Sequence, residues 1–360
     1  MFRAPSIRIV PPQCASLVLI CLVVFGVSES SAQKDSVYTK SGVAGRNSLV
    51  RGNVVESTAF KVVVDDDGNR KDVPASKINK IVFAGEPRSL ARAKDQFDAG
   101  RWDDCLETLA KLDKVPDSKL VKQKIAFTKA YATAAKAIRG DEGTSIAAAQ
   151  QALRQFIKSN STSYKLVVAI DLYGQLLLAD GKTMEAQKEF AKLTKSKWDK
   201  YVSRGHFFEG ETLVHQEKYG QATKSYQAIK SMAAADQETK QFQLLADCQL
   251  VKINAAQGKA DEGIKQLLEI IQTENPDDTR LFAIAYNALG TCYLNNSETK
   301  KACRAFLHTE LLFSNETDAH AEALYNLTRI WPQLKETDRA NRAREMLTTR
   351  YRNTIWASKL

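Results

Sequence analysis

Two different patterns of hydrophobic and polar positions divide the chain near residue 86. Between Val37 and Phe83, short β-branched stretches such as FKVVV and INKIVF alternate with turn residues. Short alternating runs of this kind are typical of strands. Asp67-Gly68 lies between two runs and predicts a β-hairpin, because Gly adopts the positive φ of a tight turn. Pro74 predicts a brief turn or 3₁₀ step before the last strand.

Four or five strands in about fifty residues predict a small, partly open β-barrel. The layout resembles the SH3-like and Sm-like small barrels. A module of this size buries little apolar surface by itself. We therefore expect residues 33–86 to form a β module that covers the first helices, while a ligand-binding role for the module stays open.

From residue 87 onwards the pattern is that of amphipathic helices. Apolar residues recur at intervals of three and four, and Gly and Pro become rare. Short polar breaks such as RGDEG and ADGKT separate the helical stretches. The pattern predicts a mostly α region, 87–360, built from successive antiparallel helix pairs.

A repeat of small and aromatic residues runs through these helices. In three blocks a Gly is followed 12 residues later by an Ala, and 4 residues after that by an aromatic residue: Gly174, Ala186, Phe190; Gly210, Ala222, Tyr226; Gly290, Ala302, Phe306. A more divergent block contains Gly258, Gly263 and Leu267. Small residues let two backbones approach, and we expect the aromatic residue to fill the gap between neighbouring repeats.

These blocks resemble the tetratricopeptide repeat (TPR) family, whose helical hairpins follow the same scheme of small, small and aromatic residues. The resemblance covers Leu90 to about Tyr351. It implies a right-handed solenoid of about five to seven antiparallel hairpins, in which residues of the first helices line a concave groove.

The first 32 residues predict a secretory signal peptide. Arg3 and Arg8 precede an uncharged run from Ala15 to Val27, and small residues follow, so we expect cleavage near Ala32. The run is shorter than the ~20 residues that a membrane-spanning helix needs. We therefore expect an exported protein (periplasmic, cell-envelope or secreted) without a stable transmembrane anchor, in a setting that resembles that of bacterial exported repeat proteins.

The charge of the chain narrows the choice of partners. Lys and Arg number 52 against 42 Asp and Glu, a formal net charge of +10. The basic residues are spread along the chain, without the basic and aromatic clusters typical of nucleic-acid binders, so we expect no nucleic-acid partner. A basic surface outside the cytoplasm is suited to anionic wall or lipid polymers, or it only promotes solubility.

The stretch LGTCYLNNSETKKACRAFLH raises the question of a metal site. Cys303 and His308 are five residues apart, a step of about 140° on a helix, so they are predicted to point apart. The sequence contains no CxxC, HxxxH or HExxH. We therefore predict that Cys292 and Cys303 pack the helices and bind no metal; a disulfide between them stays open, since export would permit it.

No motif for catalysis or cofactor binding occurs. The sequence lacks a G-x-S-x-G nucleophile elbow, a phosphate-binding loop and a dinucleotide fingerprint. We predict a non-enzymatic protein without cofactors.

The TPR resemblance implies that the protein is a scaffold or adaptor for protein or peptide partners. Its concave face would then present Asp171, Gln175, Arg204, Phe207, Glu211, His215, Lys252, Asn287, Thr291 and Asn295. Asp171 and Gln175 stand where some relatives use Lys and Asn to clamp a terminal carboxylate, which argues against that kind of partner. Alternatives are direct binding of an anionic polymer, or a place as the non-catalytic subunit of a secreted enzyme complex.

Overall fold

The computed structural model describes residues 33–40, 47–112, 114–115, 117–139, 143–234 and 236–360. The predicted signal peptide, residues 1–32, lies outside the described residues. Lys34–Leu360 form one compact unit. Within the described part of the chain, no helix has the length and apolar character needed to cross a membrane.

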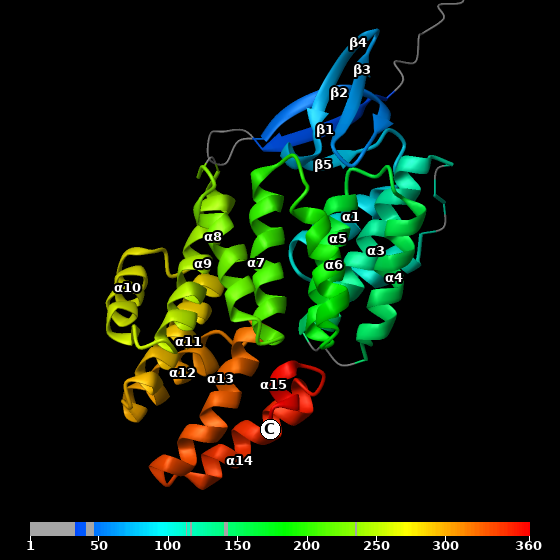
Figure 1. The fold of residues 1–360 in the computed structure, drawn as a ribbon. Helices are drawn as coiled ribbons and strands as arrows, with labels where there is room; N and C mark the ends of the chain where they lie inside the picture. The colour runs from blue at the N-terminus through cyan, green and yellow to red at the C-terminus, as the bar shows by residue number, and fades with distance from the viewer. Residues whose placement is uncertain (1–32, 41–46, 113, 116, 140–142, 235) are drawn as a thin grey trace, which may run out of the picture. The chain divides into compact units, whose positions relative to one another are not determined.

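The N-terminal module is an antiparallel sheet of five strands in the order β4-β3-β2-β1-β5 (Figure 1). The strands are β1 (Asp35–Lys40), β2 (Asn47–Ser57), β3 (Lys61–Asp66), β4 (Asn69–Pro74) and β5 (Ile78–Val82), with a 3₁₀ turn, η1 (Ala75–Lys77), before β5. In the described residues β4 and β5 do not pair, so the sheet is open rather than a closed barrel.

The turn chemistry of the module follows the sequence prediction. Asp67 and Gly68 connect β3 to β4 with φ of 52° and 89°, the two positive values that a type I′ hairpin requires. In β2, the first half pairs with β1 and the second half with β3. The change of partner occurs at Gly52, where a Cβ would lie 2.6 Å from the carbonyl oxygen of Asp65. Glycine is therefore required at this close approach.

The helical region consists of seven consecutive helix pairs and a short final helix in the described residues. The helices are α1 (Arg88–Asp98), α2 (Trp102–Ala110), α3 (Lys119–Arg139), α4 (Ile146–Ser159), α5 (Leu166–Ala179), α6 (Thr183–Leu193), α7 (Asp199–His215), α8 (Tyr219–Lys230), α9 (Gln237–Ala255), α10 (Ala260–Thr273), α11 (Thr279–Asn295), α12 (Thr299–Leu312), α13 (Thr317–Ile330), α14 (Thr337–Arg350) and α15 (Ile355–Ser358), with a 3₁₀ turn, η2 (Trp331–Leu334), after α13.

Each helix packs on the next one along the chain, and the first helices of successive pairs, such as α7 and α9 or α9 and α11, also pack on each other. The arrangement confirms the prediction of a mostly α, TPR-like stack of helix pairs (Figure 1).

The sheet shares one hydrophobic core with the first helices. Val37, Val62 and Ile81 of the sheet cluster with Leu90 of α1 and Val121 of α3. This packing confirms that the module covers the beginning of the helical stack. A buried ion pair strengthens the contact, because Lys124 Nζ lies 2.8 Å from Glu86 Oε2 and also donates a hydrogen bond to the Ile81 carbonyl oxygen.

A ring placed over a glycine recurs in three hairpins. A Cβ on Gly174 would lie 2.6 Å from Cε1 of Phe190, and one on Gly210 would lie 2.5 Å from Cε1 of Tyr226. In the third hairpin a Cβ on Gly290 would lie 2.7 Å from Cε2 of its aromatic residue, Phe306. The three rings are completely buried, as are the alanines that precede them, Ala186, Ala222 and Ala302. Each ring covers the Gly of its own hairpin, and the Phe190 ring also stacks on Phe208 of the next hairpin with 4.9 Å between centroids, so there it fills the space between neighbouring repeats as expected.

In the fourth block the large and small residues are exchanged. The prediction that Gly258 belongs to the repeat is wrong, because Gly258 lies in the turn after α9 with φ of 86°. The position equivalent to the first Gly is Val251, 12 residues before Gly263 and 16 before Leu267. A Cβ on Gly263 would lie 2.5 Å from Val251 Cγ1. The small residue has moved to the second helix, so the pair still packs closely.

The ring-over-glycine contact predicts opposite effects for two glycine substitutions. Gly210→Ala places a methyl group against the buried Tyr226 ring and should lower the free energy of unfolding by about 1–3 kcal/mol. Gly220→Ala, in the exposed first turn of α8 with no atom within 4 Å of the added Cβ, should raise it by about 0.5–1 kcal/mol. Urea denaturation measures both, and equal effects would contradict the assigned contact.

Candidate partner-binding groove

Two adjoining hollows lie along the first helices of the middle repeats. The larger, which we name the end cleft, has a volume of about 1280 Å³. Its walls are the N-terminal ends of α7, α9 and α11 together with Lys40, Ser76 and Lys77 of the β module. Five basic and five acidic side chains line it in the described part of the chain, so the end cleft has no excess of either charge.

The smaller hollow, the inner cavity, has a volume of about 170 Å³. Phe207, Phe208 and Gln249 line it from α7 and α9, and the segment from Asn315 to Ala319 at the start of α13 lines its other side. Arg280, near the N-terminus of α11, lines both hollows. The two hollows therefore adjoin at this guanidinium group, and together they are the candidate groove.

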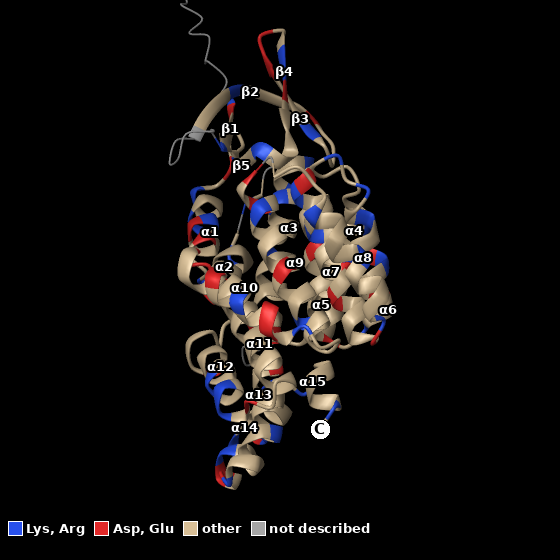
Figure 2. Cartoon of the chain, turned by 60° about the vertical axis from the view of Figure 1, so that its left-hand side comes forward, with Lys and Arg blue, Asp and Glu red and all other residues tan. Residues whose placement is uncertain are grey.

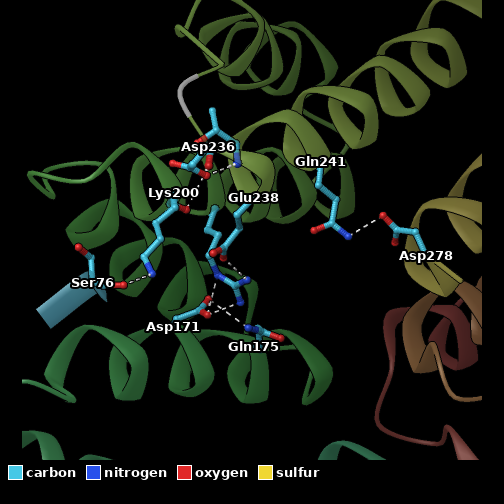
Figure 3. Close-up of polar contacts among 11 residues, drawn as sticks. Ser76, Asp171, Gln175, Lys200, Asp236, Glu238, Gln241 and Asp278 are labelled. Carbon is cyan, nitrogen blue, oxygen red and sulfur yellow. Dashed lines mark hydrogen bonds and ion pairs between the residues drawn. The ribbon is translucent and has the colours of Figure 1, made fainter. Parts of the chain in front are cut away.

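Three of the predicted groove residues bind one another. Arg204 Nε on α7 donates a hydrogen bond of 2.9 Å to Asp171 Oδ2 on α5, and Arg204 Nη1 donates one of 3.2 Å to Glu238 Oε1 on α9 (Figure 3). Gln175 Nε2 donates to Asp171 Oδ1 at 3.0 Å. These contacts link the first helices of three successive hairpins. The buried Asp171 carboxylate is consequently saturated by the protein itself and is not free to bind a partner.

The predicted groove residues Phe207 and His215 are buried rather than exposed. Phe207 is 0% exposed, because its ring packs against Phe208, Tyr226 and Phe242. His215 is 7% exposed. Its ring contacts Trp356 of α15, 5.9 Å away between centroids, so the C-terminal segment covers this end of α7. Burial lowers the pKa of His215.

Lys252 and Asn287 are also engaged within the protein. Lys252 Nζ on α9 lies 2.6 Å from Glu322 Oε1 on α13. Asn287 Nδ2 on α11 donates to Glu322 Oε2 at 3.1 Å and to the Ala319 carbonyl oxygen at 2.8 Å. Asn287 is 1% exposed, so the expectation that its side chain is exposed for contact is wrong. These bonds tie α13 to the inner face of α9 and α11.

The last two predicted residues lie further along α11 and line neither hollow. Thr291 Oγ1 donates to the Asn287 carbonyl oxygen at 3.0 Å, and Asn295 Nδ2 donates to the Thr291 carbonyl oxygen at 2.9 Å. Both side chains therefore hydrogen-bond to the backbone of their own helix, one turn back. Asn295 is exposed.

Glu211, another predicted residue, lines the inner cavity, and the pKa of its carboxyl group is shifted. Its Oε1 accepts a hydrogen bond of 2.6 Å from the Tyr226 hydroxyl group. Burial raises the pKa of Glu211 to about 7. Near neutral pH the carboxyl group is therefore divided between its neutral and charged forms.

Sequence reasoning missed Arg280, Gln249 and Phe208. The Arg280 guanidinium lies 4.8 Å from the centroid of the Phe208 ring and 5.6 Å from that of Phe207. One signal was present in the sequence. Arg280 occupies the first turn of a helix, where the positive end of the helix dipole disfavours a cation. A cation in this position suggests a role other than helix stability.

The cysteines pack in the helical core. Cys105, Cys248, Cys292 and Cys303 are all buried and free, so no disulfide joins cysteines within the described residues. Burial raises the pKa of Cys292 and of Cys303 to about 11. His308 stacks on Tyr286 with 4.4 Å between centroids. No group of three or more His, Cys, Asp or Glu side chains suited to a metal ion occurs in the described part of the chain.

The network around Arg204 predicts a large and specific loss of stability. Arg204→Ala leaves the buried Asp171 carboxylate without its cation and should lower the free energy of unfolding by about 3 kcal/mol. Replacing both partners, Arg204→Met with Asp171→Leu, should cost less than the single change. Arg342→Ala on the exposed surface of α14 is the control, and a similar loss there would contradict the prediction.

The raised pKa of Glu211 predicts a stability that falls as the pH rises. An unfolded glutamate has a pKa of about 4.3, so between that value and about 7 the folded chain binds more protons than the unfolded chain. The contribution of Glu211 to the free energy of unfolding should therefore decrease from pH 5 to pH 8. Glu211→Gln, which stays uncharged, should lose this decrease, whereas Glu185→Gln on exposed α6 should keep it. Urea midpoints at the two pH values provide the measurement.

No family model matches the chain, and no curated protein matches it either. Among solved structures, it is similar to a tetratricopeptide repeat protein from Parabacteroides merdae ATCC 43184, at 14% identity, 73% coverage of this chain, 92% of that chain and a TM-score of 0.49. A Rap protein complexed with competence and sporulation factor has 13% identity, coverages of 76% and 77%, and a TM-score of 0.48. The assignment of a TPR-like fold rests on the helix pairs and ring-over-glycine contacts described above.

Proposed function

We propose that the protein is a non-enzymatic scaffold that holds an extended segment of a protein partner in the end cleft and inner cavity. The observation that carries the proposal is the end cleft itself. It is wide, and its balanced set of acidic and basic side chains suits the mixed polar surface of a peptide. A peptide in extended form also presents backbone N–H and C=O groups to such side chains.

The end cleft is held open by contacts on both of its sides. On the helix side, the network of Asp171, Arg204 and Glu238 fixes the spacing of α5, α7 and α9 (Figure 3). On the module side, Lys200 Nζ donates a hydrogen bond of 3.0 Å to the Ser76 carbonyl oxygen. A site that is already ordered loses little conformational entropy when a partner binds.

Gln241 of α9 and Asp278 at the start of α11 extend the same arrangement by one hairpin. Gln241 Nε2 donates a hydrogen bond of 2.7 Å to Asp278 Oδ2 (Figure 3). Asp278 also caps α11, since its Oδ1 accepts from the Leu281 N–H group. Asp278 therefore caps α11 and also links it to α9, so hydrogen bonds connect the first helices of four successive hairpins beside the end cleft.

The proposal includes export to the cell envelope or beyond. Support comes from the sequence of residues 1–32, where a basic start, an apolar run of signal-peptide length and small residues follow one another. The scaffold is equally suited to act as the non-catalytic subunit of a secreted enzyme complex, with the partner supplying the catalysis.

Direct binding of an anionic polymer receives less support. In the view of Figure 2, segments with Lys or Arg and segments with Asp or Glu are interspersed over the helices. The end cleft likewise carries as many acidic as basic side chains among its described residues. A polyanion binds best where positive charge is concentrated, so this arrangement favours a protein partner.

Site-specific photo-crosslinking tests the proposed function. A photoreactive amino acid at Gln237 or Asn275, both exposed on the wall of the end cleft, should capture a protein partner in cells of the source organism. The matched control is Lys224, exposed on the second helix α8. Equal capture at Lys224, or capture there alone, would contradict a partner site in the end cleft.

A further inference from the structure

Arg280 is a cation without a direct ion pair. In the described part of the chain it has no hydrogen bond and no ion pair, and its guanidinium lies over the rings of Phe208 and Phe207. Burial lowers the pKa of Arg280, and the charge of Arg204 lowers it further, whereas the charges of Glu316, Glu211 and Asp171 offset part of this shift. The charged form of this side chain is therefore held at an energetic disadvantage that an added anion would relieve.

Arg204 provides the contrast on the neighbouring helix. Its guanidinium lies 6.0 Å from the centroid of the same Phe208 ring, so two arginines approach one aromatic residue. Arg204 is neutralised by Asp171 and Glu238. Arg280 has no such partners. The network thus compensates one of the two charges and leaves the other facing the hollows.

The acidic side chains of the inner cavity are engaged elsewhere. Glu211 accepts from Tyr226, and Glu322 pairs with Lys252. Asp318 Oδ1 accepts a hydrogen bond of 3.1 Å from Trp356 Nε1, and Glu316 Oε1 accepts one of 2.6 Å from Thr279 Oγ1. Four carboxylates line the cavity with Arg280, yet each has another partner and none pairs with it.

Gln249 supplies a second, independent indication of a ligand. It lines the inner cavity from α9 and is 3% exposed. Its Oε1 is buried and has no hydrogen-bond partner in the described residues. A buried acceptor without a donor costs free energy unless a ligand satisfies it. The cavity therefore offers an unused cation and an unused acceptor.

The size and walls of the cavity limit what can enter. A volume of about 170 Å³ has room for one side chain, and not for a helix or a sugar chain. Leu178, Ile284 and Phe208 contribute apolar surface beside Arg280, and an ion pair is stronger next to apolar surface than in bulk water.

We propose that the inner cavity binds the carboxylate of one acidic side chain of the partner segment. In this site Arg280 pairs with the carboxylate, and Gln249 Oε1 accepts a hydrogen bond from a backbone N–H group of the same segment. This inference rests on the proposed function, since it assigns one residue of the partner that lies in the groove.

The side chain of Arg280 reports directly on this binding. The probe is N-acetyl-glutamate N-methylamide, added to the ¹⁵N-labelled full chain while the Arg Nε–Hε resonances are followed by NMR. The Arg280 resonance, identified by its loss in Arg280→Gln, should shift in a saturable manner. N-acetyl-glutamine N-methylamide, the neutral analogue, should leave it unchanged. For the variants, the backbone amide resonances of the ¹⁵N-labelled chain report the titration. In Arg280→Gln the apparent Kd of the glutamate probe should rise at least tenfold, whereas Arg342→Gln, exposed on α14, should bind as the wild type does.

Three outcomes would overturn the inference. The first is an equal shift with the glutamine probe, and the second is no shift with either probe. The third is a shift only with N-acetyl-alanine, which would assign the carboxylate to a chain terminus instead of a side chain.

Thermal unfolding separates a ligand-binding role from a structural one. If Arg280 serves to bind a ligand, its removal should not destabilise the free protein, so Arg280→Gln should keep or raise Tm. A clear fall in Tm would show that the arginine supports the fold instead. Photo-crosslinking at Gln237 remains independent of these results. If crosslinking at Gln237 still captures a partner while the Arg280 resonance does not shift with the glutamate probe, this inference is rejected and the proposed function stands.

Discussion

The close contact between a glycine and an aromatic ring inside three of the hairpins is the constraint on which the middle of the helical stack depends. Where Gly210 lacks a side chain, the ring of Tyr226 lies directly over its backbone, and Gly174 and Gly290 repeat the arrangement. The divergent hairpin keeps the close approach by exchanging the roles, with Val251 on the first helix and Gly263 on the second. The fold requires that side chains fill the same space between the two helices of a hairpin, and either helix can supply the larger side chain.

The regular spacing of the hairpins decides how the buried charges meet. Because first helices of successive repeats lie side by side, a charged residue on one helix reaches its counterpart on the next, as Arg204 reaches Asp171 and Glu238. Removing charged groups from water is costly unless they are paired. The inner face therefore carries ion pairs between first helices, and Arg280 differs from Arg204 and Lys252 because it forms no ion pair within the described residues.

The β module adds a wall that a stack of helix pairs would lack. It packs on α1 and α3 through a shared core, and it also reaches the middle repeats, where Phe60 contacts Trp198 and Ser76 accepts from Lys200. The end cleft forms between this wall and the N-terminal ends of α7, α9 and α11. The module thus contributes to the candidate groove as well as covering the first helices.

The sequence by itself determined the local structure and the repeat, because these depend on neighbours within one or two helical turns. The Asp67-Gly68 hairpin, the strands and the spacing from Gly210 to Tyr226 follow from such short-range rules. Only the tertiary structure decided which polar residues are free. Asp171 and Asn287 have the polarity of contact residues, but each is buried and hydrogen-bonded to a residue 33 or 35 positions away. Whether a side chain binds its own protein or another depends on distances between repeats, which no local pattern encodes.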